Sequence, residues 1–153
     1  MLNTRAAAAA GSLALVIGAC SACATSEPST DNLPSYSSLE DARQAVAEHL
    51  DCQEDPPAPT AVMGSNGQIP SESVKCTQTV EIFHFQSPDA RDEAYALMAN
   101  AAGSQGSVYF AEGKNWFVVD YSEVGIGDAS TVPEPVDLSV LSEPLGTRFT
   151  EMS

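Results

Sequence analysis

Residues 74–85 have the sequence VKCTQTVEIFHF, and SPDARDEAYALMANA follows at 87–101. β-Branched and aromatic residues dominate the first stretch, which is typical of a β-strand. Its apolar side chains alternate between two faces, with Val74, Cys76, Val80 and Ile82 on one and Phe83 and Phe85 on the other. We therefore expect one strand over 74–85, with both of its faces covered near the C-terminal end.

The second stretch carries the signals of a helix N-terminus. Ser87 is a favourable N-cap, Pro88 fits the first turn, and Asp89 complements the positive end of the helix dipole. Helical spacing predicts a buried stripe of Ala90, Ala94, Leu97 and Ala101, with Met98 beside it. Gly103 suits the C-cap of this helix.

Upstream of the strand, a helix is predicted over residues 37–50. Ser37 and Glu40 form a capping box at its start. Its predicted buried face consists of Leu39, Ala42, Val46 and Leu50. The connection 53–72 contains four prolines and two glycines, with a small hairpin predicted around Asn66-Gly67. Loops of this length are uncommon unless they are functional or held in place.

Downstream, two short apolar runs on either side of residues 112–114 predict a β-hairpin. Alternation places Trp116, Val118 and Asp120 on one face of its second strand and Phe117, Val119 and Tyr121 on the other. We expect Trp116 in the core, with a ligand platform as the alternative. A short helix is predicted over 137–145, capped by Asp137 and ended by Gly146, and 147–152 is predicted to add an edge strand.

These elements predict an α+β fold. We expect a two-layer domain, in which two to three helices pack on a three- to four-stranded, mainly antiparallel sheet. The predicted organisation is a signal peptide over 1–19, a lipidated N-terminus and disordered tether over 20–35, and one domain over 36–153. The tether is assigned from its serine, threonine, proline and acidic residues.

Two of the four cysteines, Cys52 and Cys76, lie in the predicted domain. In an exported protein such a pair predicts a disulfide. The bond would close a loop of about 25 residues and stabilise the fold by about 3 kcal/mol. A metal site or a catalytic thiol is the alternative, for which His49 and His84 are the only histidine partners in the chain.

The N-terminus resembles a bacterial lipoprotein signal peptide. An apolar run over 6–19 follows Arg5 and ends in Ile17-Gly18-Ala19-Cys20, which resembles a lipobox. The run is too short to span a bilayer, and a buried core helix is the alternative. The resemblance implies cleavage before Cys20, lipid on its thiol, and a location on the extracytoplasmic side of the cell membrane. Cys23 is a second possible anchor, but its preceding triplet lacks an aliphatic first residue.

The chain is strongly acidic, with 21 Asp and Glu against 6 Lys and Arg and a formal net charge of −15. Nucleic acid is excluded as a partner, because its binding requires neutralisation of phosphates. The same charge repels anionic lipid head groups, so a lipid anchor rather than a basic patch would hold the protein on a membrane.

Several short motifs together resemble a group of small actinobacterial envelope lipoproteins. These are the Cys52…Cys76 pair, the strand ending at Phe85, the stretch 87–92 that opens a helix, and Gly113-Lys114-Asn115-Trp116 in the hairpin. The resemblance covers residues 37–122. It implies an envelope lipoprotein with one disulfide, and it assigns no functional residues.

The chain carries no sequence motif for catalysis or for cofactor binding. It contains no G-x-S-x-G elbow, no H-E-x-x-H and no glycine-rich phosphate loop. His84 fits a packed strand position, and His49 is explained by the end of a helix dipole. Acidic side chains at Glu54-Asp55 and within 89–93 lack the spacing of a calcium loop, and the helix dipole accounts for the second group. We therefore predict no catalytic residue, cofactor or metal.

Two functions remain. The first is a non-enzymatic binding module of the cell envelope with a protein partner, recognised through the loop 53–72 and the turn 112–116. The second is an envelope hydrolase with an unrecognised active site. A deep pocket that holds His84 beside a carboxylate would favour the hydrolase.

Overall fold

The computed structural model describes residues 30–103, 106–124 and 133–153. The predicted signal peptide, Cys20, Cys23 and residues 20–29 of the predicted tether lie outside these residues. Within the described ranges, no helix is both long enough and apolar enough to cross a bilayer.

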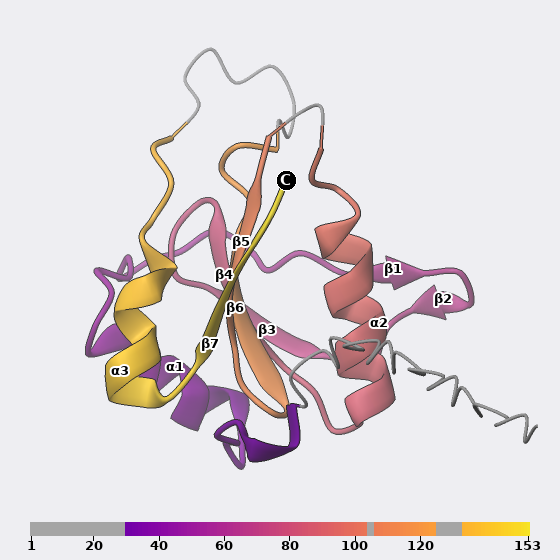
Figure 1. Ribbon diagram of the computed structural model, residues 1–153, viewed down its shortest axis with the longest axis horizontal. Helices are drawn as coiled ribbons and strands as arrows, with labels where there is room; N and C mark the ends of the chain where they lie inside the picture. The colour runs from indigo at the N-terminus through magenta and orange to yellow at the C-terminus, as the bar shows by residue number, and fades with distance from the viewer. Residues whose placement is uncertain (1–29, 104–105, 125–132) are drawn as a thin grey trace, which may run out of the picture.

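An antiparallel sheet of five strands forms the centre of the domain (Figure 1). In spatial order the strands are β3 (Glu72–Lys75), β4 (Val80–His84), β6 (Trp116–Asp120), β5 (Val108–Glu112) and β7 (Arg148–Met152). The hairpin β5–β6 and the edge strand β7 were predicted from the sequence. A separate small hairpin joins β1 (Met63–Gly64) to β2 (Gly67–Gln68), as the Asn66-Gly67 pair predicts.

The sheet has more strands than the three or four predicted, because residues 74–85 are not one strand. A tight turn separates β3 from β4, with the Cys76 and Thr77 amides both donating to the Val80 carbonyl. The Thr77 hydroxyl accepts from the amides of Thr79 and Val80, which stabilises the reversal. The apolar alternation continues across the turn, so the faces predicted for these side chains are correct.

Helices cover both faces of the sheet (Figure 1). One face carries α1 (Leu39–Ala47), the 3₁₀ turn η2 (Leu138–Leu141) and the short α3 (Ser142–Leu145). The opposite face carries α2 (Pro88–Ala99). The α+β class is confirmed, but the domain has three layers rather than two. The central strands carry apolar side chains on both faces, so helices must pack on each face to bury them.

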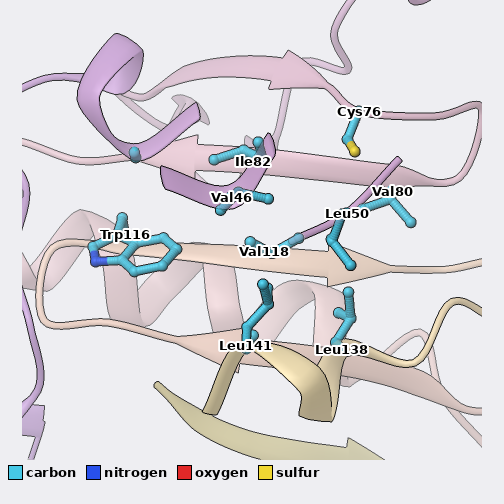
Figure 2. Close-up of a cluster of buried hydrophobic side chains, with 11 residues drawn as sticks. Val46, Leu50, Cys76, Val80, Ile82, Trp116, Val118, Leu138 and Leu141 are labelled. Atoms are coloured by element: carbon cyan, nitrogen blue, oxygen red, sulfur yellow. The ribbon is translucent and has the colours of Figure 1, made fainter. Parts of the chain in front are cut away.

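Two hydrophobic clusters therefore form, one on each face. Figure 2 shows the first cluster, in which Val46 of α1 and Leu50, just beyond the end of that helix, lie over Val80, Ile82 and Val118 of the sheet. Leu138 and Leu141 of η2 and the fully buried Trp116 complete that side. The second cluster, under α2, is aromatic and is built on Phe83, Phe85, Phe110 and Phe117. Trp116 is thus a core residue, as expected.

The helix ends differ in detail from the predictions. The N-cap of α1 is Ser38, whose hydroxyl accepts from the Asp41 amide at 3.2 Å, whereas Ser37 donates to the Asp41 carboxylate. The N-cap of α2 is Ser87, with Pro88 in the first turn, as predicted. Its C-cap is Asn100 rather than Gly103. The C-cap of α3 is Gly146, which adopts a left-handed φ of 65°.

The buried side of α2 is rotated relative to the predicted stripe. Leu97 is 38% exposed, whereas the charged Arg91 is only 3% exposed. Ala94 and Ala99 complete the buried side, and Tyr95 and Met98 pack partly against the aromatic cluster. A count of apolar residues alone misplaces this stripe, because it treats Arg91 as exposed. The guanidinium of Arg91 is buried in an ion pair with Glu112 of β5.

The predicted disulfide joins Cys52 to Cys76, with the two Cα atoms 4.4 Å apart. It fastens the chain just after α1 to the β3–β4 turn. The Gln53 amide also donates to the Cys76 carbonyl at 2.8 Å. The bond therefore closes both ends of the proline-rich connection, as the sequence predicts.

Candidate binding site around His84

His84 lies at the end of β4 and is 5% exposed. Its Nε2 atom is 3.1 Å from the carbonyl oxygen of Tyr36 and 3.2 Å from the side-chain nitrogen of Asn115. Three segments far apart in the sequence therefore meet at this imidazole: the residues before α1, the end of β4, and the β5–β6 turn.

Asn115 and Tyr36 fix one another through a pair of hydrogen bonds. The Tyr36 amide donates to Asn115 Oδ1 at 3.1 Å, and Asn115 Nδ2 donates to the Tyr36 carbonyl at 2.8 Å. The orientation of the side-chain amide is settled by this pairing, because the Tyr36 amide can only donate. The position of the Tyr36 carbonyl beside His84 is settled with it.

The chain just before α1 is part of the domain. The Pro34 carbonyl accepts from the Lys114 amide at 2.8 Å and from the Trp116 indole at 3.0 Å. The Tyr36 ring meets the Trp116 ring edge to face at 5.0 Å. The prediction of a disordered tether over 20–35 is therefore wrong for its last residues, whose main-chain contacts composition does not reveal.

The turn after β5 leaves no room for a larger residue at Gly113. A Cβ atom at this position would lie 2.0 Å from Trp116 Nε1. Glycine therefore allows the indole to lie under the turn and reach the Pro34 carbonyl. The same turn then presents Asn115 to Tyr36 and His84.

The other imidazole nitrogen, His84 Nδ1, is buried beside a hollow. It has no hydrogen-bond partner in the described part of the chain, and Glu72 Oε2 lies 3.6 Å away. The hollow has a volume of about 530 Å³ and is lined by Pro70, Ser71, Glu72, His84, Gln86, Ser87, Asp89, Ala90 and Glu93. We call it the Nδ1 hollow. A second hollow of about 510 Å³ adjoins it on the Tyr36 side and shares His84, Gln86 and Ser87 with it.

The Nδ1 hollow is acidic. Glu72, Asp89 and Glu93 lie on its exposed rim, and neither lysine nor arginine is among the described residues that line it. Asp41 lies close enough to His84 to interact with its charge, and hydrogen bonds from Ser37 and Ser38 hold the pKa of Asp41 below its ordinary value. The surroundings of the hollow are therefore negatively charged.

The imidazole is badly placed for a serine-type hydrolase. In such a site the acid orients one ring nitrogen while the other faces the nucleophile. Glu72 fits the first role, but His84 Nε2 faces the Tyr36 carbonyl and the Asn115 amide rather than a hydroxyl. The nearby Ser87 hydroxyl accepts from the Ala90 amide at 3.3 Å as the cap of α2.

A second polar cluster, not predicted from the sequence, lies under α2. The fully buried Glu112 accepts from Arg91, from Arg148 at 2.8 Å and from Thr150 at 2.6 Å. Burial alone would raise the pKa of Glu112, but the hydrogen bonds from Arg148, Thr150 and Arg91 outweigh burial and lower it. These hydrogen bonds join α2 to β5 and β7, so the cluster is structural.

The acidic groups considered for calcium do not converge. Within the described ranges, no group of three or more His, Cys, Asp or Glu residues is arranged to hold a metal ion. Glu54 and Asp55 are exposed in the loop after the disulfide, and Arg91 points inward to Glu112 and away from any such group. His49 is exposed just beyond α1 and does not contribute to the Nδ1 hollow.

The predicted recognition surface is only partly assembled. The end of the 53–72 loop and the 112–116 turn meet near His84, as Glu72 and Asn115 show. The middle of the loop packs on the sheet instead: Val62 and Ile69 are buried in the aromatic cluster. The Thr60 amide also donates to the buried Glu81 at 2.8 Å. These two side chains and the Thr60 amide anchor the loop to the domain, whereas most of the β1–β2 hairpin between Val62 and Ile69 is exposed.

Comparison of the chain with protein-family models, with curated proteins and with solved structures found no match.

Proposed function

We propose that this protein is a lipid-anchored lipoprotein on the extracytoplasmic side of the cell membrane. It acts there as a non-enzymatic binding module of the envelope, as the resemblance to small actinobacterial envelope lipoproteins also implies. The observation that supports binding is His84: one of its nitrogens is fixed by the fold, and the other is buried beside the Nδ1 hollow without a hydrogen-bond partner in the described residues. Buried polar atoms of this kind are rare unless a ligand or water satisfies them.

An envelope hydrolase is the alternative, and one observation favours it. His84 Nδ1 lies 3.6 Å from the Glu72 carboxylate in a hollow of about 530 Å³, which is the pairing of a base with its orienting acid. The binding function is preferred because the nitrogen that would have to reach a nucleophile faces a peptide carbonyl.

Replacing Cys20 with alanine is expected to release the protein from the membrane fraction or to leave its precursor uncleaved. The reason is that the lipobox-like sequence ends at this thiol, and the net charge of −15 repels anionic lipid head groups, so the lipid has to hold the protein on the membrane. Radiolabelled palmitate followed by fractionation checks this. Cys23→Ala serves as the matched control and should still be labelled. Normal labelling of Cys20→Ala would assign the anchor to Cys23.

A photo-crosslinking side chain at position 86 is expected to capture an envelope ligand. Gln86 is exposed and borders both hollows, whereas Gln78 is exposed in the β3–β4 turn at the other end of β4 and serves as the control position. Irradiated membranes should give an adduct from position 86 and none from position 78. Identical adducts at both positions would contradict a site at His84. Turnover of an ester, peptide or glycan that His84→Ala abolishes would establish the hydrolase instead.

A further inference from the structure

We propose that the Nδ1 hollow binds a primary ammonium group on an alkyl chain, of the kind that a lysine side chain presents. The assignment rests on the binding half of the proposed function and does not depend on the lipid anchor. The ammonium donates to His84 Nδ1 and to the Glu72 carboxylate, while the other two rim acids supply the attracting field.

The first step concerns the proton of His84. The Tyr36 carbonyl only accepts, and it lies 3.1 Å from Nε2, so we assign the imidazole proton to Nε2. The Asn115 nitrogen does not compete for Nε2. It forms a nearly equilateral triangle with Nε2 and the Tyr36 oxygen. When one of its two N–H groups is directed at that oxygen at 2.8 Å, the other lies about 120° away and points past Nε2. Neutral His84 therefore has its lone pair on Nδ1.

The second step concerns what this lone pair meets. Nδ1 is buried without a hydrogen-bond partner in the described structure, and its nearest polar neighbour, Glu72 Oε2 at 3.6 Å, is also an acceptor when ionised. Two acceptors that face each other require a donor between or beside them. A ligand that carries both N–H donors and positive charge satisfies the two atoms together.

The third step concerns charge. Asp89 and Glu93 stand on the same rim as Glu72, and the described lining includes no lysine or arginine. A concave surface of one sign concentrates ions of the opposite sign. Anionic ligands are disfavoured by the same groups and by the net charge of −15.

An organic cation fits better than a metal ion. No three ligating side chains of the described residues converge, and metal ions need such a set at short distances. An ammonium group directs three donors to separated acceptors and brings an alkyl stem. Pro70 and Ala90 line the hollow and offer apolar surface to that stem.

The test is an NMR titration of the whole ¹⁵N-labelled chain in detergent micelles. The probe is Nα-acetyl-lysine amide, and its Nε-acetylated derivative, which lacks the charge, is the matched control. The lysine probe should shift the Nδ1 resonance of His84 and the amides of Ser71 and Glu72 in a saturable way. Glu72→Gln should weaken its affinity about tenfold, as expected for loss of a charge-assisted hydrogen bond. Glu93→Gln should weaken the affinity less, because Glu93 contributes only to the electrostatic field of the rim and accepts no hydrogen bond from the ammonium group.

Both substitutions are at exposed rim positions, so the fold is expected to persist, and Glu143→Gln on α3 controls for the removal of one acidic charge. An equal response to the Nε-acetylated probe would overturn the ammonium assignment. A His84 that carries protons on both nitrogens and stays unchanged by the probe would also overturn it, because imidazolium pairs with Glu72 directly. If position 86 still crosslinks an envelope ligand in that case, the binding function stands without this ligand class. If neither experiment gives a signal, both proposals fail.

Discussion

Glu112→Gln is expected to lower the free energy of unfolding by about 3–5 kcal/mol. Glu112 is fully buried and accepts hydrogen bonds from two arginines and a threonine. Removing its charge leaves the buried guanidinium of Arg91 without its principal counterion, and an unmatched buried charge is far more costly than a missing ion pair. Urea unfolding followed by circular dichroism measures the change.

Two comparisons keep this prediction specific. Glu151→Gln removes the charge of an exposed side chain on β7 and should change stability by less than about 0.5 kcal/mol. The double variant Arg91→Met with Glu112→Met should lose less than the sum of the two single changes, because apolar groups can replace a buried pair. A loss below about 1 kcal/mol in Glu112→Gln would contradict a stabilising role for the cluster.

The carboxylate of Glu112 should also make the free energy of unfolding depend on pH in the acidic range. The pKa of Glu112 lies below its ordinary value of 4.5 in the folded protein. Its contribution to stability is therefore complete above the unfolded-state pKa and is lost as the pH falls through the lower folded-state pKa. Glu112→Gln should lack this part of the acid dependence, which unfolding curves collected at several pH values below neutrality would show.

Replacing Cys52 and Cys76 together with alanine is expected to lower the free energy of unfolding by about 3 kcal/mol. The disulfide spans 24 positions and fastens the chain just after α1 to the β3–β4 turn. Without it, the unfolded chain gains freedom, and in the folded state the connection 53–75 is held by Thr60, Val62 and Ile69. Thermal and urea unfolding in the presence and absence of reductant measure the effect.

The amides of residues 53–58 should lose hydrogen-exchange protection in this variant before those of residues 60–69. A reductant that leaves the wild-type unfolding curve unchanged would contradict a closed disulfide, as would two thiols that react with alkylating agents in the native protein. The expected order follows from the contacts of the loop: its middle is anchored by Val62 and Ile69 in the aromatic cluster, whereas its first part is held mainly by the disulfide.

Local patterns predicted most of the elements correctly. Ser87-Pro88-Asp89 marks the start of α2, Asn66-Gly67 marks the small hairpin, and Asp137 with Gly146 brackets the last helical segment. The β3–β4 turn was missed because threonine has a high strand propensity, and only its hydroxyl bonds to the main chain reveal the reversal. Periodicity misplaced the α2 stripe because it treats an arginine as exposed.

The candidate site was harder to predict, since its members come from distant segments. Tyr36 and Asn115 are 79 positions apart, and nothing in either neighbourhood indicates that they pair. His84 was recognised as a strand residue, but its partners depend on which strand ends lie together at one edge of the sheet. Arg91 and Glu112 are 21 positions apart and would have required the sheet order to be known first.

The order of the strands along the chain also has a consequence for biosynthesis. β7 pairs with β5 and follows it by more than thirty residues, so Arg148 and Thr150 reach the ribosome exit long after Glu112 does. Until they arrive, Glu112 lacks two of its donors and β5 has an unpaired edge. A nascent chain that ends before β7 cannot complete the five-stranded sheet. The last native contacts therefore form only after β7 has been synthesised.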